Sequence, residues 1–484
     1  MELDKDLRSR QEVRDLVGRA HAASQVLAGW EQRQIDSVVK AVSDAGLAHA
    51  RELAEMACAE TGFGNVPDKI RKNEFAAGRV YEAIRSQKTV GIIAEHPQEK
   101  ILDVGVPVGV VAGIVPSTNP TSTVLYKALV TLKAGSAIVF SPHPGAVKCT
   151  LRAVEIAAEA ARKAGCPEGA VAAVSTPTMA AVEELMRHEH VRLILATGGA
   201  AMVHAAYSSG KPAIGVGAGN GPAYIHHSAD LARAVRDIIV SKTFDNGTIC
   251  ASEQSVVVEA SMEKAVREEM ARQGCCFLNT EQAKKLAGFL FLPGGGINVQ
   301  AVGRTAPEIA GLAGLDGVPD TARVLVAREN EAGPTHPYSR EKLCPILAFY
   351  VEPDEAHILE KSCEILRHEG SGHTYVIHAE DQEVIRRFGQ RIPVSRFLVN
   401  TPAALGGIGA ATNLFPALTL GCGAVGGSSS SNNIGPMDLI NIRRIAWGVR
   451  DMEAAGGHTT TDTAAVSDKL VDELVARILQ KLNR

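Results

Sequence analysis

The sequence predicts an α/β protein of two or three domains, and three observations support this class. The chain has 484 residues, which is more than a single domain usually contains. Its hydrophobic content of 45% is enough for a sizeable core. Short strand-like apolar runs alternate with helical segments at intervals of about 20–25 residues, a pattern typical of βαβ units and a parallel sheet.

The first 88 residues are expected to be mainly helical. They are rich in Ala, Glu and Arg, with apolar residues at helical spacing. The range 101–115 changes to β-branched residues spaced by glycines and is expected to form a strand. A turn at 116–120 ends it, and a helix follows to about Lys133. The early helical segments span 9–30, 31–59 and 68–88, with a break at 61–64.

The clearest alternation of strands and helices runs from residue 137 to residue 216. The expected strands span 137–140, 171–174, 191–196 and 213–216, and the expected helices span 146–164, 178–188 and 200–208. Ligands of parallel sheets bind outside the carboxyl ends of the strands. The polar turns at 116–120, 141–144 and 197–199 therefore mark a candidate ligand-binding edge.

A second α/β unit begins with a helix at 229–241. Its expected strands span 255–260, 323–327, 346–351, 374–378 and 396–400. A stretch rich in Gly, Ser and Asn follows at 401–435. The segment limits expected from these patterns are 1–228, 229–430, 431–453, 454–466 and 467–484.

The C-terminal tail differs from the rest of the chain. The segment 454–466 is low in apolar residues and is expected to be a linker. After it, Ser467 is the expected N-cap of an amphipathic helix with charged residues on its other side. The apolar stripe of that helix consists of Leu470, Val471, Leu474, Val475, Ile478, Leu479 and Leu482.

Composition excludes several classes of function. The net charge is −4, with both signs interspersed, and aromatic residues make up only 4%, so nucleic-acid binding is not expected. No apolar run reaches the roughly 18 residues that a membrane span needs. The charged N-terminus lacks the apolar core of a signal peptide, so a cytoplasmic protein is expected. Nine scattered cysteines without a C-x-x-C pair argue against a disulfide framework or a zinc site.

Cys250 is the strongest candidate for a nucleophile. It follows Gly247 by three residues, on a polar loop that leads into the strand at 255–260. A glycine permits a sharp bend there, and the backbone N–H of Cys250 is available to hold an oxyanion. From these residues alone, a structural role for this cysteine remains the alternative.

Other motifs are weaker. The turns 141–144 and 197–199 each join a strand to a helix and offer backbone N–H groups to a pyrophosphate. The glycine-rich segment 215–221 is either a dinucleotide loop or a plain connection. The histidines at 188–190 and 226–227 lack the spacing of metal ligands and are expected to be solvated, so no metal is expected. Cys275 and Cys276, near the end of a helix, are expected to be structural.

The chain resembles the aldehyde dehydrogenase superfamily, and within it the coenzyme A-acylating acetaldehyde dehydrogenases. The matching stretches fall in order over residues 20–450. They are 115–122 (VPSTNPTS), 140–144 (FSPHP), 196–199 (ATGG), 206–212 (AYSSGKP), 215–220 (GVGAGN), 244–255 (FDNGTICASEQS), 341–345 (EKLCP), 372–374 (GHT) and 418–423 (LTLGCG).

The resemblance implies an aldehyde dehydrogenase-like fold, with a Rossmann-type NAD-binding domain at 1–228 and an α/β catalytic domain at 229–430. It also implies that Cys250 forms a thioester with the substrate. Asn119 would hold the oxyanion, with Thr118 as the alternative, because the family's Pro-x-Asn is one residue longer here. His373 would deprotonate coenzyme A or would pack. The expected cofactor-binding residues are Val115, Pro116, Ser117, Ser141, His143, Thr197, Gly198, Gly199, Gly217, Glu341 and Leu343.

Departures from the wider superfamily refine these expectations. Hydrolytic members carry a Glu where this chain has Val216, so the thioester is expected to await a thiol and not water. Ser141 and His143 replace the family's Lys and Glu that bind the adenosine ribose, and NAD is expected, with NADP as the alternative. The expected reaction converts a short aldehyde, first acetaldehyde, to acyl-CoA. Propionaldehyde, sulfoacetaldehyde and succinate semialdehyde are the alternative substrates.

Two readings compete with this one, namely a hydrolytic dehydrogenase and an inactive scaffold or shell-interacting protein. The resemblance also implies a homodimer or a dimer of dimers, with contacts near 101–115 and 435–450. The tail at 467–484 resembles the encapsulation peptides that carry enzymes into bacterial microcompartments, where it would meet the shell or co-encapsulated enzymes. A bundle or oligomerisation helix is its alternative.

Overall fold

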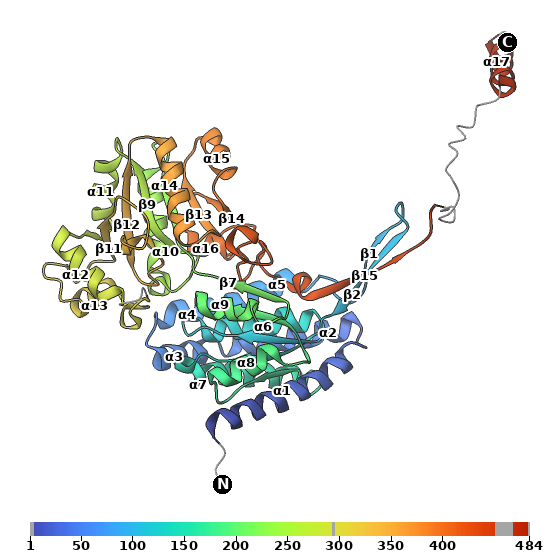
Figure 1. Ribbon diagram of the computed structural model, residues 1–484, viewed down its shortest axis with the longest axis horizontal. Helices are drawn as coiled ribbons and strands as arrows, with labels where there is room; N and C mark the ends of the chain where they lie inside the picture. The colour runs from blue at the N-terminus through green and yellow to red at the C-terminus, as the bar shows by residue number, and fades with distance from the viewer. Residues whose placement is uncertain (1–3, 293–295, 451–467, 483–484) are drawn as a thin grey trace.

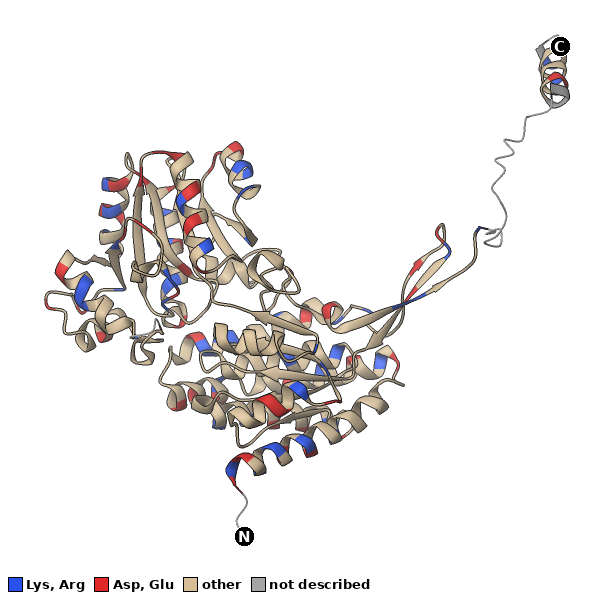
Figure 2. Ribbon diagram, viewed as in Figure 1, with Lys and Arg blue, Asp and Glu red and all other residues tan. Residues whose placement is uncertain are grey.

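The computed structural model describes residues 4–292, 296–450 and 468–482. Two parallel sheets, each covered by helices, form the body, and a three-stranded antiparallel sheet projects from it (Figure 1). This is the α/β architecture with two parallel-sheet units that the sequence predicts. Lys and Arg alternate with Asp and Glu over the visible helices (Figure 2). In the described residues no helix is both long and apolar enough to cross a membrane.

The first domain is built on a five-stranded parallel sheet in the order β5-β4-β3-β6-β7. Its strands are β3 (Val110–Ile114), β4 (Ala137–Ser141), β5 (Val171–Ala173), β6 (Val191–Thr197) and β7 (Ala213–Val216). Helix α6 (Pro120–Lys133) is buried along its whole length, because it lies between the sheet and the N-terminal helices. The remaining helices are α1 (Lys5–Leu27), α2 (Gln32–Ala48), α3 (Ala50–Thr61), α4 (Val66–Glu74), α5 (Val80–Ile84), α7 (Val147–Lys163), α8 (Met179–Arg187) and α9 (Ala200–Tyr207), with a π-helical turn at Phe75–Arg79.

The second domain contains a seven-stranded parallel sheet in the order β10-β11-β12-β9-β8-β13-β14. Its strands are β8 (Gly221–Ile225), β9 (Glu253–Glu259), β10 (Cys275–Phe277), β11 (Val324–Arg328), β12 (Ile346–Glu352), β13 (Gly372–His378) and β14 (Val394–Val399). Its helices are α10 (Leu231–Thr243), α11 (Glu263–Arg272), α12 (Thr280–Leu290), α13 (Ala306–Leu312), α14 (Glu355–His368), α15 (Gln382–Gly389) and α16 (Ala403–Gly407).

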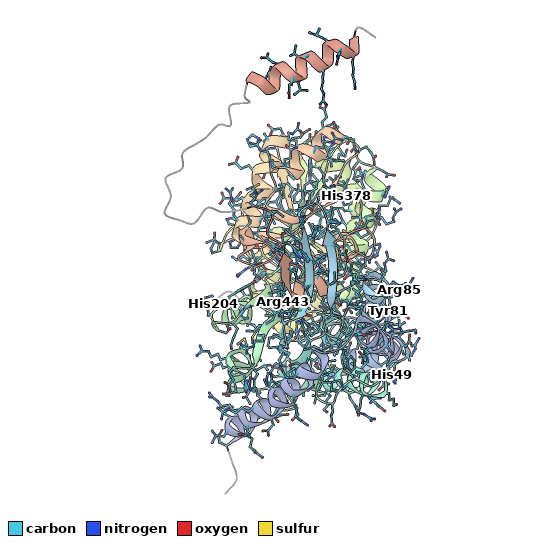
Figure 3. The ribbon with its side chains drawn as sticks, turned by 90° about the vertical axis from the view of Figure 1, so that its right-hand side faces the viewer. His49, Tyr81, Arg85, His204, His378 and Arg443 are labelled. Atoms are coloured by element: carbon cyan, nitrogen blue, oxygen red, sulfur yellow. The ribbon has the colours of Figure 1, made fainter. Side chains whose placement is uncertain are left out.

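The antiparallel sheet has the order β1-β2-β15 and combines β1 (Gly91–His96), β2 (Ile101–Pro107) and β15 (Ile440–Ala446). Figure 3 views this sheet from the right-hand side of Figure 1, with Arg443 marking β15. Before β15, the chain returns to the first domain, where the Tyr126 hydroxyl donates to the Ile434 carbonyl at 2.5 Å. Helix α17 (Asp468–Leu482) lies within the predicted tail helix, whereas Ser467 and the predicted linker lie outside the described residues.

The structure corrects several expected boundaries. The range 101–115 holds two strands in different sheets, because the chain breaks at Gly109, whose φ is +109°. The seven-stranded sheet already includes β8, so the chain enters it at residue 221 and not after 228. The expected helix at 31–59 is two helices, α2 and α3, and Cys275 and Cys276 begin a strand that follows α11.

Candidate active site

The Cys250 loop is built from consecutive residues in the left-handed conformation. Asp245 and Asn246 have φ values of 47° and 53°, and Gly247 has a φ of 78°. Such angles are unfavourable for residues other than glycine and persist only where surrounding contacts hold them. The loop joins α10 to β9, and Cys250 is a half-buried residue at its end. The sequence predicted the bend at Gly247 but not the two residues before it.

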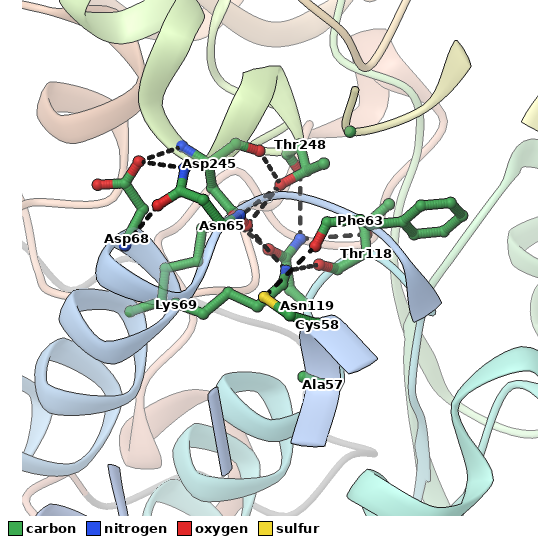
Figure 4. Close-up of polar contacts among 12 residues, drawn as sticks. Ala57, Cys58, Phe63, Asn65, Asp68, Lys69, Thr118, Asn119, Asp245 and Thr248 are labelled. Carbon is green, nitrogen blue, oxygen red and sulfur yellow. Dashed lines mark hydrogen bonds and ion pairs between the residues drawn. The ribbon is translucent and has the colours of Figure 1, made fainter. Parts of the chain in front are cut away.

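Two lysines of α4 hold this loop through Asp245, and Figure 4 labels one of them, Lys69, together with Asp245. The carboxylate is fully buried, and its Oδ2 accepts from Lys69 Nζ at 3.0 Å and from Lys72 Nζ. Burial opposes ionisation of this carboxyl, but the two ammonium groups outweigh burial and hold its pKa below the usual range. Burial in turn lowers the pKa of Lys72 to about 8, although Asp245 opposes that shift.

The expected oxyanion residue, Asn119, belongs to the same network. Its Oδ1 accepts from Lys72 Nζ at 2.5 Å. Its Nδ2 donates to the Thr248 carbonyl at 3.2 Å and to the Thr118 hydroxyl at 3.1 Å. The side-chain amide therefore lies against the chain two residues before Cys250, with one N–H on the Thr248 carbonyl of the loop and the other on the Thr118 hydroxyl.

The glycine-rich connection between β7 and β8 packs directly on the nucleophile. A Cβ atom placed on Gly219 would lie 1.8 Å from the carbonyl oxygen of Cys250 and 3.2 Å from Cε1 of His373. The Gly219 N–H donates to Oε1 of Glu341 at 2.9 Å. Only glycine fits at this position, and the connection gathers Cys250, His373 and Glu341 into one site.

The residues around Cys250 keep its thiol protonated. Burial, reinforced by Glu341 and Cys422, raises the pKa of Cys250 to about 12, and the Arg396 guanidinium only partly opposes this. Burial also raises the pKa of Glu341 to about 8. Formation of the thiolate therefore needs a general base or a lower pKa of the thiol when a ligand binds.

His373 is buried and neutral at physiological pH. Its Nδ1 pairs with the Thr374 hydroxyl at 2.9 Å, and its Nε2 has no hydrogen-bond partner within the described part of the chain. Burial, reinforced by Arg396, lowers its pKa to about 3. The geometry thus offers a free imidazole nitrogen in the site.

Most of the expected cofactor residues line one cavity of about 530 Å³ at the carboxyl edge of the five-stranded sheet. Apolar side chains such as Met179, Val182 and Met202 complete its walls. The hydroxyls of Ser141 and Thr197 are buried without partners in the described structure, so this edge has spare hydrogen-bonding capacity for a polar ligand. The cavity brings together Val115, Pro116, Ser141, His143, Thr197, Gly198 and Gly199.

The remaining expected cofactor residues lie outside the lining of this cavity. Glu341 is bonded to Gly219, as described above. Leu343 has a φ of 48°, and its carbonyl accepts from the N–H of Gly303 at 3.0 Å. The cavity lining does not include Ser117, Gly217, Glu341 or Leu343.

Of the histidine pair at 226–227, only His226 is less solvated than the sequence suggested, and His227 is exposed as expected. His226 is buried, and its Nε2 lies 3.2 Å from Glu355, while His227 Nδ1 lies 3.4 Å from Glu259. The ligand atoms of all four residues fall within 4.8 Å of one another. However, the N–H of Ser228 donates to His226 Nδ1, which leaves the Nε2 proton to bond Glu355. Hydrogen bonds account for this cluster.

Sequence reasoning missed the residues that support the nucleophile. Lys69 and Lys72 have the spacing of an ordinary solvated helix face, yet both are 3% exposed. Arg396 is a buried guanidinium that donates to the carbonyl oxygens of Gly372 and Gly421, next to His373 and Cys422. No local signal marks these residues, because their partners are far away in the chain.

Comparison with known proteins identifies the family. The model of the aldehyde dehydrogenase family matches residues 6–274. The bifunctional aldehyde-alcohol dehydrogenase of Escherichia coli is 43% identical over 446 residues, which are 91% of this chain and 50% of that protein. The chain therefore spans about half the length of the curated relatives that it matches first.

Solved structures share the fold over nearly their whole length. A probable aldehyde dehydrogenase from Listeria monocytogenes is 58% identical, with a TM-score of 0.92. The match covers 93% of this chain and 99% of that one. An acetylating aldehyde dehydrogenase from Geobacillus thermoglucosidasius is 49% identical, with a TM-score of 0.91. The match covers 94% of this chain and 100% of that one. A propionaldehyde dehydrogenase from a Clostridium phytofermentans microcompartment is 29% identical, with a TM-score of 0.81 and coverages of 90% and 97%. The chain therefore belongs to the aldehyde dehydrogenase family.

Proposed function

We propose that this chain oxidises a short aldehyde, first acetaldehyde, and transfers the acyl group from a Cys250 thioester to coenzyme A. The observation that carries the proposal is the Cys250 loop, which is held in a left-handed conformation with Gly219 against its carbonyl and His373 beside it. The similarity to an acetylating aldehyde dehydrogenase supports the acyl acceptor.

The residues act in sequence on one carbonyl carbon. The sulfur of Cys250 attacks the aldehyde, and the carbonyl electron pair moves to oxygen. The N–H of Cys250 and Nδ2 of Asn119 hold that oxyanion. NAD, when bound, supplies the hydride acceptor that leaves a thioester on Cys250. The thiol of coenzyme A then attacks the thioester, and Cys250 departs as a thiolate. Glu341 and the free Nε2 of His373 are the groups in the site that can take protons.

The cavity at the carboxyl edge of the five-stranded sheet supports NAD as the cofactor. Ser141 and Thr197 offer unpartnered hydroxyls, and Gly199 precedes the N-terminus of α9, which favours a pyrophosphate. No carboxylate lines this cavity to repel a 2′-phosphate, so NADP is the alternative cofactor.

The hydrogen bonds of Arg396 indicate whether the substrate carries a charge. The four N–H groups at its two terminal nitrogens are turned toward the oxygens of Ser431, Asn433, Gly372 and Gly421. These four N–H groups are therefore not available to clamp a substrate carboxylate or sulfonate, and only the buried Nε–H is without a partner in the described structure. That favours an uncharged aldehyde, acetaldehyde or propionaldehyde, over succinate semialdehyde and sulfoacetaldehyde.

A hydrolytic dehydrogenase is the second candidate, and one observation favours it. The sequence near Val216 lacks a carboxylate, but the fold brings Glu341 onto Gly219, close enough to raise the pKa of Cys250. A carboxylate there is able to activate water in place of a thiol.

We expect NADH formation from acetaldehyde to depend on coenzyme A. Without coenzyme A, the thioester should persist, so NADH should appear only as a burst of about one equivalent per site. With coenzyme A, turnover should continue. Stopped-flow absorbance of NADH measures both phases, and propionaldehyde serves as the matched alternative substrate. Full turnover without coenzyme A would contradict the acylating reaction and would establish hydrolysis.

The tail and the antiparallel sheet support two further proposals. Val471, Leu474, Val475, Ile478 and Leu479 of α17 are each about half exposed, and we propose that this face binds a microcompartment shell or a co-encapsulated enzyme. The relative from a microcompartment is consistent with that location.

We also propose that a second copy of the chain packs against the exposed apolar residues Ile442, Ile445 and Trp447 of β15 and its continuation, which gives a dimer or a dimer of dimers.

We expect a chain that ends at residue 450 to keep its activity and its oligomeric state but to lose encapsulation. The truncation removes α17 and leaves β15 intact. Light scattering reports assembly, and co-purification with shells from cells that express them reports encapsulation. Encapsulation equal to that of the full chain would refute the role of the tail, and a change to monomers would assign the tail to assembly instead.

A further inference from the structure

The Lys72 ammonium lies at the junction between the nucleophile loop and Asn119. It donates to the Asp245 carboxylate, to Thr248 Oγ1 at 3.0 Å and to Asn119 Oδ1 at 2.5 Å. These three acceptors use its three protons. Because the side chain is 3% exposed, water does not compete for them. Each contact is therefore a fixed part of the site.

This arrangement determines which way the Asn119 amide points. An ammonium group can only donate, so it accepts no bond from an amide nitrogen and must face Oδ1. Nδ2 is then turned to the other side, toward Thr248 O and the loop that carries Cys250. If the amide rotated by 180°, Nδ2 would face the ammonium without an acceptor, and the buried cation would lose a partner. Lys72 thus selects one of two amide orientations.

We propose that Lys72 is a positioning residue for the oxyanion site and orients the Asn119 amide so that Nδ2 donates to the oxygen of the substrate. The two N–H groups of Nδ2 donate to the Thr248 carbonyl and the Thr118 hydroxyl, and the substrate oxygen replaces one of these acceptors. The inference rests on the proposed function only in requiring attack of Cys250 on an aldehyde. Lys72 does not touch the substrate in this scheme. Its charge also polarises the amide from behind, which makes Nδ2 a stronger donor as negative charge forms on the substrate oxygen.

Lys69 provides a matched control. It lies one turn earlier on the same helix, is equally buried and binds the same Asp245 oxygen at 3.0 Å. Its other hydrogen bond goes to the Thr118 carbonyl at 3.1 Å, and the structure gives it no hydrogen bond to the Asn119 amide. Replacing either lysine by Met removes one buried cation from Asp245, but only Lys72→Met releases the amide.

The test measures the NADH burst from acetaldehyde without coenzyme A, a step shared by acylating and hydrolytic enzymes. We expect Lys72→Met to slow the burst by about 10- to 100-fold, because a misplaced oxyanion donor costs that much. Lys69→Met should slow it by a smaller factor. In an Asn119→Ala background, Lys72→Met should cause no further loss, since the amide that it orients is gone. Whether turnover after the burst requires coenzyme A tests the acyl acceptor of the proposed function. That result leaves the role of Lys72 untouched.

A spectroscopic measurement separates positioning from general damage to the fold. The carbonyl stretch of the Cys250 thioester, isolated by ¹³C labelling of the aldehyde, falls in frequency when an oxyanion donor binds it. We expect that shift in the wild type and in Lys69→Met, and its loss in Lys72→Met and Asn119→Ala. Equal defects in the two lysine variants would overturn the proposal. So would a Lys72→Met defect that persists in full on top of Asn119→Ala, or an unchanged stretch in Lys72→Met.

Discussion

Cys250→Ala will abolish NADH formation from an aldehyde, both with and without coenzyme A. In the proposed reaction the sulfur of Cys250 bonds to the substrate, and loss of a covalent nucleophile typically costs about 10⁴- to 10⁶-fold in kcat. The backbone N–H groups and Asn119 remain, so aldehyde still binds but cannot form the species that gives up hydride. Both the burst and the steady-state phase should vanish in stopped-flow records.

Cys276→Ala is the matched control for this result. Cys276 is also partly exposed, but it lies on β10, at the edge of the seven-stranded sheet. This variant should keep both kinetic phases. Mass spectrometry of the acyl-enzyme adds a second readout, since the mass of one acyl group should appear on wild-type protein and on Cys276→Ala only. A burst of wild-type size in Cys250→Ala would remove Cys250 from the mechanism.

Strands of the first domain could be predicted because they are short, β-branched and separated by turn residues. The runs at 137–140, 191–196 and 213–216 match β4, β6 and β7 almost residue for residue. By contrast, β8 contains Gly221 and Pro222, which are poor strand formers, and its place in the second sheet comes from pairing with β9 and β13. Such long-range pairing has no local signal, so the predicted boundary fell too late.

In the candidate site, too, features with a local sequence signal could be predicted and long-range contacts could not. The glycine at 247 and the cysteine at 250 are neighbours, and the sequence indicated their loop. The cofactor turns were also predictable, because parallel strands end at one edge of a sheet. The bond between Lys72 and Asp245 spans 173 residues of sequence, and nothing near either residue indicates the other. Long-range ion pairs of this kind require the fold.

Asp245→Ala will destabilise the protein more than removal of either of its lysines. The variant leaves Lys69 and Lys72 buried without their counter-ion, and an uncompensated buried charge typically costs about 3–5 kcal/mol. Lys69→Met leaves Asp245 paired with Lys72 and should cost less. Urea denaturation at pH 7 measures the free energy of unfolding for each variant. The double variant Lys69→Met/Asp245→Ala has one unpaired cation fewer and should recover part of the loss.

The pH dependence of Asp245→Ala identifies the cause of its instability. The pKa of Lys72 is already lowered to about 8 by burial against the opposing effect of Asp245, and without Asp245 it falls further. Between that lowered value and the ordinary lysine pKa of about 10.4, the unfolded chain binds more protons than the folded chain. Stability of the variant relative to the wild type should therefore rise between pH 7 and about 8 and level off above it, because in that range Lys72 loses its charge in the variant while the wild type still holds it charged. A deficit that stays constant over this range would mean that lost packing, and not unpaired positive charge, destabilises the loop that carries Cys250.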